Sequence, residues 1–557
     1  MQRIEAAIEC AVKSRKYGVL ITETFDLARS QAQSAVSKGL TPFPVVVKDC
    51  FAVEGYKMTC ASKMLENYVP PYTATVVQRL LDKGGCIIGK ANMDEFCMGT
   101  SSVLGHFGPV KSALTEDVAD DWLVPGGSSG GSAVAVQLGI AEMFNFFSCS
   151  GIGSDTGGSS RNPAAFNGIF GLKPTYGVLS RHGLVPLVNS LDVPSILAKS
   201  ATSCWKSLGM CSYLPLATTL SWFLHLLFCL QMMTGTDKQD STSTNLPLSD
   251  GCSSLSGLRI GIPKEYHNEF LSDDAWKVWN HAANLLHRKG AEIVEVSLPH
   301  TKYSLICYQV ISAADIASNM ARYDSIEYGH RSKNEKSTFN LYASSRSEAF
   351  NTVVKRRIMA GNYFLMREWV VLVLHSFVSW FSSSCPNNVL YSVPWGKKAG
   401  EMPQRRRARG GAQNSEWVQR KIDTVHEYST IVACETECSK HSPYRNRKEH
   451  FDKALRVRRV IAREIYDMFG SVDLLLTPTA TGPPPLFSKL RQGFYKREDQ
   501  DDFYTQPANL AGVPAISVPC GSSDNLPIGV QLIGNLLKDR LVCDVAQLLY
   551  DAALDSR

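Results

Sequence analysis

Short apolar runs alternate with longer amphipathic segments along most of the chain. Residues 73–82 (TATVVQRLLD) place their apolar side chains on one helical face, and Gly84 and Gly85 follow as a stop signal before an apolar run at 86–88. The same order returns later in the chain. We predict strands at 43–47, 258–262, 292–298, 472–476, 515–518 and 529–533, with helices at 272–289 and from about 538. This alternation predicts an α/β protein.

Three segments interrupt this pattern, at about 142–152, 204–233 and 369–448. The first is aromatic and irregular, the second is mainly apolar, and the third runs from apolar to basic. We expect one domain over residues 1–557 with these segments as foreign insertions. Residues 214–233 approach the length of a membrane span, but Pro215, His225 and Gln231 weaken that reading, so no stable membrane association is expected.

The composition is that of a globular protein, with 44% hydrophobic and 20% charged residues. The sixteen cysteines form no CxxC pair and no set with zinc-ligand spacing, so we expect no metal site and a reducing compartment. Residues 382–448 hold twelve Lys or Arg against six Asp or Glu, which accounts for the whole net charge of +6. Such a run is more often a solvated loop than a nucleic-acid surface. Residues 1–16 form an amphipathic helix pattern without a clear presequence.

Two serine clusters carry the most informative chemistry, PGGSSGGSA at 125–133 and GSDTGGSSRNP at 153–163. Alone, GGSSGG reads as a flexible linker. The apolar residues 133–140 would not follow a solvated linker, so tight turns leading into a buried helix are favoured. In the second cluster, successive backbone N–H groups stand beside the hydroxyl of Ser159, as an oxyanion hole for a serine nucleophile requires.

A nucleophilic serine needs a base, and neither cluster contains a histidine. His106 and His182 lie in predicted loops, so a Ser-His-Asp triad is open but unsupported. Lys48 ends the apolar run FPVVV, and a strand there would carry its amine into the interior, where burial disfavours the ammonium form. The alternative is a lysine exposed at a strand end.

The two clusters and VVVKDCF at Lys48 resemble the amidase signature family. KANMDEFCMG, SNMARYDSIEYGHRS, FNTVVKRRIMAGNYF and DDFYTQPANLAGVPAISVPCG extend the resemblance to the glutamine-hydrolysing subunits of tRNA-dependent amidotransferases. About three quarters of the chain is covered. The resemblance implies a large mixed β-sheet covered by helices on both faces.

The resemblance also implies roles for individual residues. Ser159 matches the nucleophile, Lys48 the base, and Ser128 a relay serine held on a cis peptide bond. The matching oxyanion-hole and substrate-binding positions are Thr156, Gly157 and Gly158 for the backbone donors, and Tyr308, Arg357 and Asp502 for glutamine. Arg357 can take the substrate carboxylate and Asp502 its α-ammonium group.

The same resemblance implies two partners, subunits B and C. Ammonia from glutamine would pass to the first of these, which activates glutamyl-tRNA with ATP and magnesium and makes the main tRNA contacts. The second, which is small, would clamp the pair. This chain would bind no cofactor, and a mitochondrial matrix location is implied.

Three alternatives stay open: another amidase acting on fatty-acid or other amides, an inactive scaffold within the same kind of complex, and a membrane-anchored protein. The inactive scaffold is considered because about seven more residues separate Ser128 from Ser159 than is usual in the family. Extra residues there could displace the two serines, and a displacement of about 1 Å can lower the rate about a hundredfold.

Overall fold

One mixed sheet organises the protein. The computed structural model describes residues 1–115, 121–141, 151–209, 233–244, 246–366, 447–491 and 500–556. Eleven strands follow the order β1-β3-β2-β4-β6-β5-β10-β11-β9-β7-β8. Their bounds are β1 Leu20–Glu23, β2 Phe43–Lys48, β3 Gly85–Ala91, β4 Gly151–Asp155, β5 Phe170–Lys173, β6 Val193–Ala198, β7 Arg259–Pro263, β8 Glu292–Val296, β9 Leu474–Pro478, β10 Ala515–Ser523 and β11 Leu526–Gly534.

Parallel and antiparallel pairs are combined in this sheet. Strand β2 runs parallel to both of its neighbours, β3 and β4, and β7 runs parallel to β8 and β9. The remaining pairs are antiparallel. Because β2 has a partner on each side, its last residue, Lys48, is delivered into the interior and not to a sheet edge. The predicted α/β class with a large mixed sheet is confirmed.

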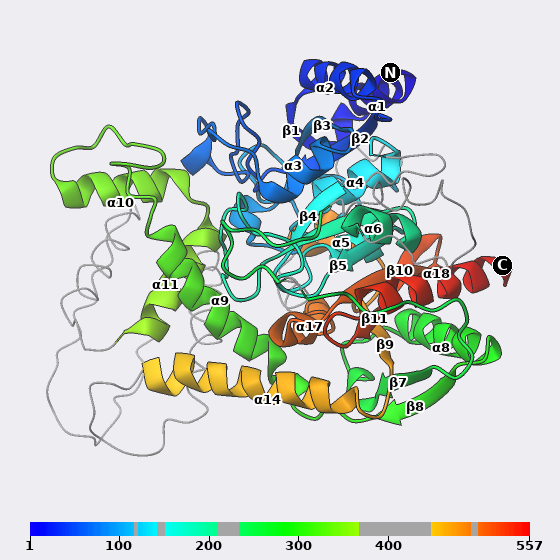
Figure 1. The fold of residues 1–557 in the computed structure, drawn as a ribbon. Helices are drawn as coiled ribbons and strands as arrows, with labels where there is room; N and C mark the ends of the chain where they lie inside the picture. Colours follow the sequence, from blue (N-terminus) through cyan, green and yellow to red (C-terminus); the bar gives the residue numbers. More distant parts are fainter. Residues whose placement is uncertain are drawn as a thin grey trace, which may run out of the picture. The chain divides into compact units, whose positions relative to one another are not determined.

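Helices cover both faces of the sheet. The helices are α1 Gln2–Lys13, α2 Phe25–Ser37, α3 Thr75–Leu81, α4 Gly130–Leu138, α5 Arg161–Phe166, α6 Ala201–Leu208, α8 Asp273–Arg288, α9 Ser304–Met320, α10 Thr338–Ala349, α11 Thr352–Leu365, α14 Lys453–Met468, α15 Phe487–Arg491, α17 Gln506–Ala511 and α18 Asp539–Asp555. Figure 1 shows α1 and α2 at the end of the sheet formed by β1, β2 and β3, and α8 and α18 beside its other half.

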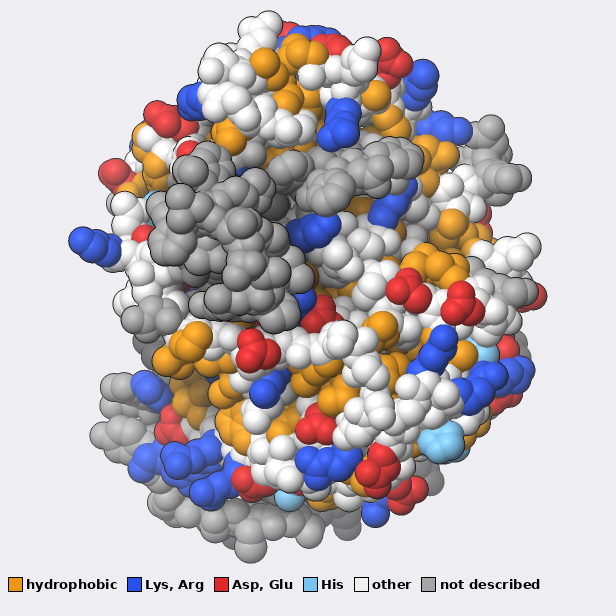
Figure 2. Space-filling model, turned by 45° about the vertical axis from the view of Figure 1, so that its right-hand side comes forward, with side chains coloured by type: hydrophobic (Ala, Val, Ile, Leu, Met, Phe, Trp, Pro, Cys, Tyr) orange, Lys and Arg blue, Asp and Glu red, His pale blue; other side chains and the backbone are white. Residues whose placement is uncertain are grey.

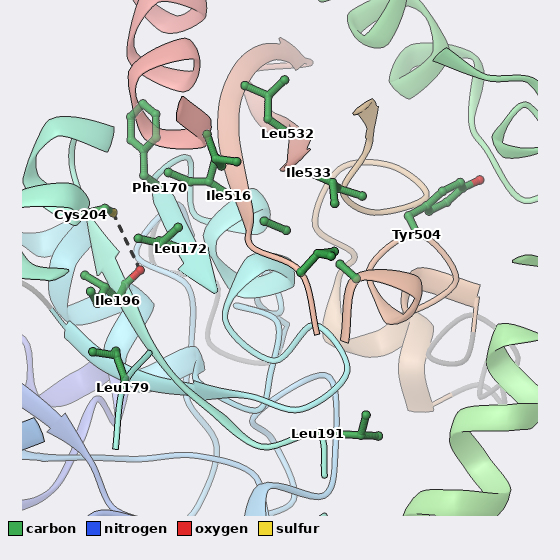
Figure 3. Close-up of a cluster of buried hydrophobic side chains, with 14 of the residues drawn as sticks. Phe170, Leu172, Leu179, Leu191, Ile196, Cys204, Tyr504, Ile516, Leu532 and Ile533 are labelled. Atoms are coloured by element: carbon green, nitrogen blue, oxygen red, sulfur yellow. Dashed lines mark hydrogen bonds between the residues drawn. The ribbon is translucent and has the colours of Figure 1, made fainter. Parts of the chain in front are cut away.

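The side chains of β2 alternate between two buried clusters, one on each face of the sheet. Val46 belongs to a buried cluster with residues of α1, α2 and α4. Val45 and Val47 belong to a second cluster, which contains buried residues of α3, α6, α8 and α18. Successive strand residues point to opposite faces, so a strand that is apolar throughout needs cover on both. Figure 3 shows part of the second cluster, where Phe170, Leu172, Ile196 and Ile516 lie around Cys204 of α6.

Most predicted elements lie where the sequence places them. The predicted helices at 73–82 and 272–289 are α3 and α8, and the hydroxyl of Ser272 caps α8 by accepting the N–H of Ala275 at 3.2 Å. The strand predicted at 86–88 is longer, since β3 is paired along Gly85–Ala91 by β2 and also pairs with β1. Strand β10 likewise continues past residue 518 because β11 pairs with it as far as Ser523.

The three predicted insertions fall largely outside the described residues, which omit 142–150, 210–232 and 367–446. Two of their predicted boundaries are too wide. Residues 151–152 begin the central strand β4, and residues 204–208 complete α6, whose Leu208 is fully buried. Met1–Leu365 and Glu449–Arg557 form one compact unit.

Two further observations concern the surface. Among the described residues, no helix combines the length and apolar character needed to cross a bilayer. Of the candidate span at 214–233, only Met233 is described. Figure 2 shows acidic and basic side chains intermixed over the described part of one face. The basic segment at 382–448 lies outside the described residues, except for Arg447 and Lys448.

Candidate active site

The first serine cluster forms the turn that leads into α4. Ser128 is fully buried and follows a cis peptide bond from Gly127, as the resemblance implies. Glycine is required at 127, because a Cβ there would lie 2.2 Å from Oδ2 of Asp94. That oxygen is fixed in turn by the N–H groups of Ser101 and Ser102, at 3.3 and 2.9 Å. The contact with Asp94 therefore fixes the turn that carries Ser128.

Lys48 ends β2 with its side chain fully buried. Its Nζ lies 2.7 Å from Oγ of Ser128, 2.9 Å from Oγ of Ser129 and 2.9 Å from Oγ of Ser154. The adjacent carboxylate of Asp49 is paired instead with Lys90 at 2.9 Å. The prediction of a buried Lys48 is confirmed, and the alternative of a solvent-exposed strand end is wrong.

The three hydroxyls define what Lys48 can do. A neutral amine donates two N–H groups and offers one lone pair, so it can donate to two hydroxyls and receive a proton from the third. The hydroxyl of Ser129 has another acceptor, the carbonyl oxygen of Ser154 at 3.2 Å. The shortest contact, to Ser128, is thus placed for proton transfer, at a distance suited to general base chemistry.

The second serine cluster follows β4. Ser159 is half-buried, and its carbonyl oxygen accepts the N–H of Ser129 at 3.0 Å. The two clusters are therefore joined directly, even though residues 142–150 separate them in sequence. In the described residues, the segment between the two serines therefore leaves the backbones of the two clusters in contact.

Asp155 organises the loop that carries Ser159. Its carboxylate accepts the N–H of Gly158 at 2.9 Å and Nη2 and Nε of Arg161 at 2.9 and 3.0 Å. Burial by itself would raise the pKa of Asp155, but the charge and hydrogen bonds of Arg161 outweigh it and bring the pKa to about 2. Both side chains are fully buried. Arg161 also reaches Asn509, Gln531 and the carbonyl oxygen of Thr505, so the loop is tied to α17 and β11.

These contacts correct part of the predicted oxyanion hole. The N–H of Gly158 is already engaged by Asp155. No described residue accepts the N–H of Gly157 or Ser159. The N–H groups of Gly157 and Ser159 are thus available as donors, whereas Gly158 serves the turn: its φ is +135°, and a Cβ there would lie 2.2 Å from Oγ1 of Thr505.

Thr156 has its own support beneath the loop. Its hydroxyl donates to Oδ1 of Asp192 at 2.7 Å, and the other carboxylate oxygen accepts the N–H groups of Leu187 and Val188 at 2.8 and 2.9 Å. Burial raises the pKa of Asp192 to about 7, against the opposing effect of these donors. Asp192 thus fixes Thr156 from below, a role that its surroundings in sequence do not indicate.

The predicted substrate-binding residues lie close together. Tyr308 of α9 is buried, and burial raises its pKa; a hydrogen bond and the charge of Arg357 oppose the shift, and the charge of Asp502 adds to it. Helix α9 packs against α11, which carries Arg357. A Cβ at Gly157 would lie 2.8 Å from Cζ of Tyr308. The tyrosine ring therefore connects the loop of Ser159 with Arg357 and Asp502.

The described residues give no support to a histidine base or to a metal site. His182 stacks on Tyr72 with ring centroids 5.1 Å apart and contacts the hydroxyl of Thr75, and His106 lies 4.0 Å from Glu66. Neither histidine hydrogen-bonds to Ser128 or Ser159. The described part of the chain holds no group of three or more His, Cys, Asp or Glu side chains suited to a metal ion.

Sequence reasoning missed Ser129, Ser154, Asp155, Arg161, Asp192 and Thr505 as parts of this site. For one pair a signal exists. Asp155 and Arg161 are opposite charges six residues apart in an otherwise uncharged stretch of small residues, and buried charges of this kind require partners. The contacts of Asp192 and Thr505 cross from distant parts of the chain, so no local pattern reveals them.

Comparisons with known proteins agree with this geometry. The model of the amidase family matches residues 3–212, 223–372 and 405–543. The A-subunit of mitochondrial glutamyl-tRNA(Gln) amidotransferase from Mus musculus is 38% identical, with 96% of this chain and 87% of the relative aligned. The corresponding protein of Drosophila pseudoobscura is 37% identical over 98% and 91%.

Solved structures show the same fold. The A-subunit of glutamyl-tRNA(Gln) amidotransferase from Thermotoga maritima superposes with a TM-score of 0.61 at 27% identity, over 94% of this chain and 90% of that one. The structure of a 6-aminohexanoate cyclic dimer hydrolase, at 19% identity, reaches a TM-score of 0.68 over 99% and 92%.

Proposed function

The chain belongs to the amidase family, and from that premise we propose that it is the A-subunit, the glutaminase, of a glutamyl-tRNA(Gln) amidotransferase. It hydrolyses glutamine and supplies ammonia for the conversion of Glu-tRNA(Gln) to Gln-tRNA(Gln). The observation that carries the proposal is the buried contact of 2.7 Å between Lys48 Nζ and Ser128 Oγ, beside the loop of Ser159. Similarity to the A-subunit over 96% of the chain selects the reaction.

The residues act in a relay. Neutral Lys48 takes a proton from Ser128, and Ser128 takes one from Ser159 as the Oγ of Ser159 attacks the side-chain carboxamide of glutamine. The N–H groups of Gly157 and Ser159 stabilise the negative charge on the carboxamide oxygen. The returning proton leaves with ammonia, and a glutamyl ester remains on Ser159. Water then hydrolyses the ester by the same relay and gives glutamate.

The preference for glutamine follows from Tyr308, Arg357 and Asp502. The guanidinium of Arg357 offers paired donors to the α-carboxylate, and the carboxylate of Asp502 offers an acceptor to the α-ammonium group. Simple amides carry neither charge. Because Tyr308 packs on Gly157, substrate held by Arg357 and Asp502 lies beside the oxyanion donors.

The chain acts in an assembly. Its relatives are named as subunits of an amidotransferase, so other subunits complete the reaction. We expect a B-subunit that binds ATP and magnesium and makes the main contacts with tRNA, and a small C-subunit. No cofactor is expected on this chain. The relatives are named mitochondrial, which supports a location in the mitochondrial matrix.

The three interrupting segments are proposed to be untrimmed intervening sequence or products of alternative splicing. The family match omits residues 213–222 and 373–404, which lie inside the second and third segments. Sequencing the mature transcript tests this proposal. Finding all three segments in the message would overturn it, and deletion of residues 142–149 would then test whether the first segment affects the rate.

Hydrolysis of several amides tests the proposed function. The purified chain, with and without subunits B and C, is offered glutamine, asparagine, propionamide and a long-chain fatty amide, and ammonia is measured. We expect glutamine to be preferred by at least about a hundredfold, since the half-buried charges of Arg357 and Asp502 match its α-substituents. A preference for the fatty amide would identify another amidase, and no hydrolysis of any amide would identify an inactive scaffold.

A further inference from the structure

Ser154 connects the base of the relay to two cysteines. On one side its Oγ accepts a hydrogen bond from Nζ of Lys48 at 2.9 Å. On the other side it lies 3.8 Å from Sγ of Cys50 and 3.6 Å from Sγ of Cys97. One hydroxyl therefore separates the amine of Lys48 from two sulfur atoms.

The backbone fixes both thiols. Cys50 follows Lys48 by two residues, so its position is tied to the end of β2. Phe96 and Cys97 both have left-handed φ angles, 50° and 62°, which non-glycine residues seldom adopt. The N–H of Phe96 donates to the carbonyl oxygen of Cys60 at 2.9 Å, and its ring packs against Tyr323. The chain thus holds Cys97 in an unfavourable conformation that directs it to Ser154.

The two thiols interact and differ in character. A hydrogen bond from Cys50 is the main cause that lowers the pKa of Cys97 to about 6; burial opposes this, and the hydrogen bond of Ser154 assists it. Burial raises the pKa of Cys50, and Cys97 adds to that shift. Of the pair, Cys97 is therefore the thiol that ionises more readily, and Cys50 the one that keeps its proton. In reversible oxidation these are the attacking and the resolving cysteine.

We propose that Cys50 and Cys97 form an oxidation site whose disulfide switches off glutamine hydrolysis. The thiolate of Cys97 attacks one oxygen of hydrogen peroxide, the O–O bond breaks, and a sulfenic acid and hydroxide form. The sulfur of Cys50 then attacks the sulfenic sulfur, the S–O bond breaks, and the proton of Cys50 leaves with the hydroxyl as water. Both sulfur atoms are oxidised, and peroxide is reduced to water.

The disulfide acts on Lys48 through its neighbours. Bonded sulfur atoms are separated by about 2 Å, closer than two thiols in hydrogen-bond contact, so forming the bond draws the two sulfur atoms together beside Ser154. It also pulls on the chain two residues after Lys48. A displacement near 1 Å of Nζ from Ser128 costs on the order of a hundredfold in rate. Cys97 is 8% exposed and Cys50 fully buried, so an oxidant that reaches the pair must be as small as peroxide.

The test treats the full-length chain with hydrogen peroxide and follows two readouts, the peptide linked through Cys50 and Cys97 by mass spectrometry and the rate of glutamine hydrolysis. We expect the linked peptide to appear as the rate falls by at least about tenfold, and dithiothreitol to reverse both changes. Cys97→Ser should resist peroxide. Cys50→Ser should form no linked peptide and be inactivated irreversibly through sulfinic acid.

Cys86→Ser is the matched control, because Cys86 is equally buried in β3 and its thiol donates only to the nearby carbonyl oxygen of Gly84 at 3.4 Å. Each variant is compared with its own untreated rate, and Cys86→Ser should respond to peroxide as the wild type does. Absence of the linked peptide, or equal sensitivity of Cys97→Ser, would overturn the proposal. The inference rests on the proposed glutaminase, but the peptide readout does not, so an untreated chain without glutaminase activity would refute only the function.

Discussion

Nζ of Lys48 lies 2.7 Å from Oγ of Ser128, although the two residues are eighty positions apart in the chain. The contact exists because β2 carries a lysine into the interior and a turn built on Gly127 presents the serine to it. Both side chains are fully buried, so hydration of their polar groups does not explain their positions. Burying a lysine without a carboxylate partner costs free energy, so its presence here indicates a function.

Replacement of Lys48 by methionine should lower the rate of ammonia release from glutamine by at least about a thousandfold, because the relay loses its base. Arginine at this position should be as harmful, since a guanidinium does not release its proton near neutral pH. Lys57→Met is the matched control, because this lysine is exposed and contacts only Asn67 at 3.2 Å through its amine. Comparable activity of the methionine variant at position 48 and the wild type would exclude the relay.

Arg357→Ala should raise KM for glutamine by roughly tenfold to a hundredfold, the loss of about 1.5 to 3 kcal/mol for a hydrogen bond to a charged group. The turnover number should change less, since Arg357 binds the carboxylate and not the reacting carboxamide. Arg356→Ala is the control, because the neighbouring side chain is exposed. Steady-state kinetics with glutamine separate the two constants. An unchanged KM at position 357 would place the substrate elsewhere.

Gly157→Ala should lower kcat/KM by about a hundredfold, since the new methyl would meet Cζ of Tyr308 at 2.8 Å and displace an oxyanion donor. At Gly470 an added Cβ meets only the carbonyl oxygen of Asp467 at 3.2 Å, in an exposed turn far from the relay in sequence. Gly470→Ala should therefore retain its activity. Equal kinetics for the two variants would show that the contact between Gly157 and Tyr308 does not position the loop.

Asp192 should make stability depend on pH. Burial keeps its proton up to about pH 7 in the folded protein, whereas the unfolded chain loses it near the ordinary pKa of 3.8. Between these values the folded state binds more protons, so the free energy of unfolding contributed by this group falls as pH rises. The difference between wild type and Asp192→Asn should decrease by roughly 1 to 4 kcal/mol from pH 4 to pH 8 in urea titrations. A difference independent of pH would mean that Asp192 is ionised throughout.

Local pattern was sufficient for much of the fold and for the relay. The apolar run before Lys48 correctly indicated a strand with a buried end, and the apolar residues after Gly131 correctly indicated a buried helix. Ser159 was found because two glycines precede it and successive backbone N–H groups stand beside its hydroxyl, whereas the relay role of Ser128 came from the resemblance. Tyr308, Arg357 and Asp502 came from resemblance alone, and the structure places them around one another.

The rest could not be predicted because it depends on contacts between distant segments. Nothing near Asp192 in the sequence indicates that it receives the hydroxyl of Thr156, 36 residues earlier. Gly158 was expected to supply an oxyanion donor, but whether its N–H is free depends on the rotamer of Asp155, which Arg161 fixes. Nothing in the sequence indicates that Cys50 and Cys97 lie together; the fold brings both to Ser154.

The most direct test of the relay is ammonia release from glutamine by the wild-type chain and by Ser159→Ala, measured side by side with mass spectrometry of the acid-quenched protein. The account predicts a glutamyl ester on Ser159 in the wild type, no ester in the variant, and a rate at least about a thousandfold lower. Ammonia release by Ser159→Ala at the wild-type rate would contradict it.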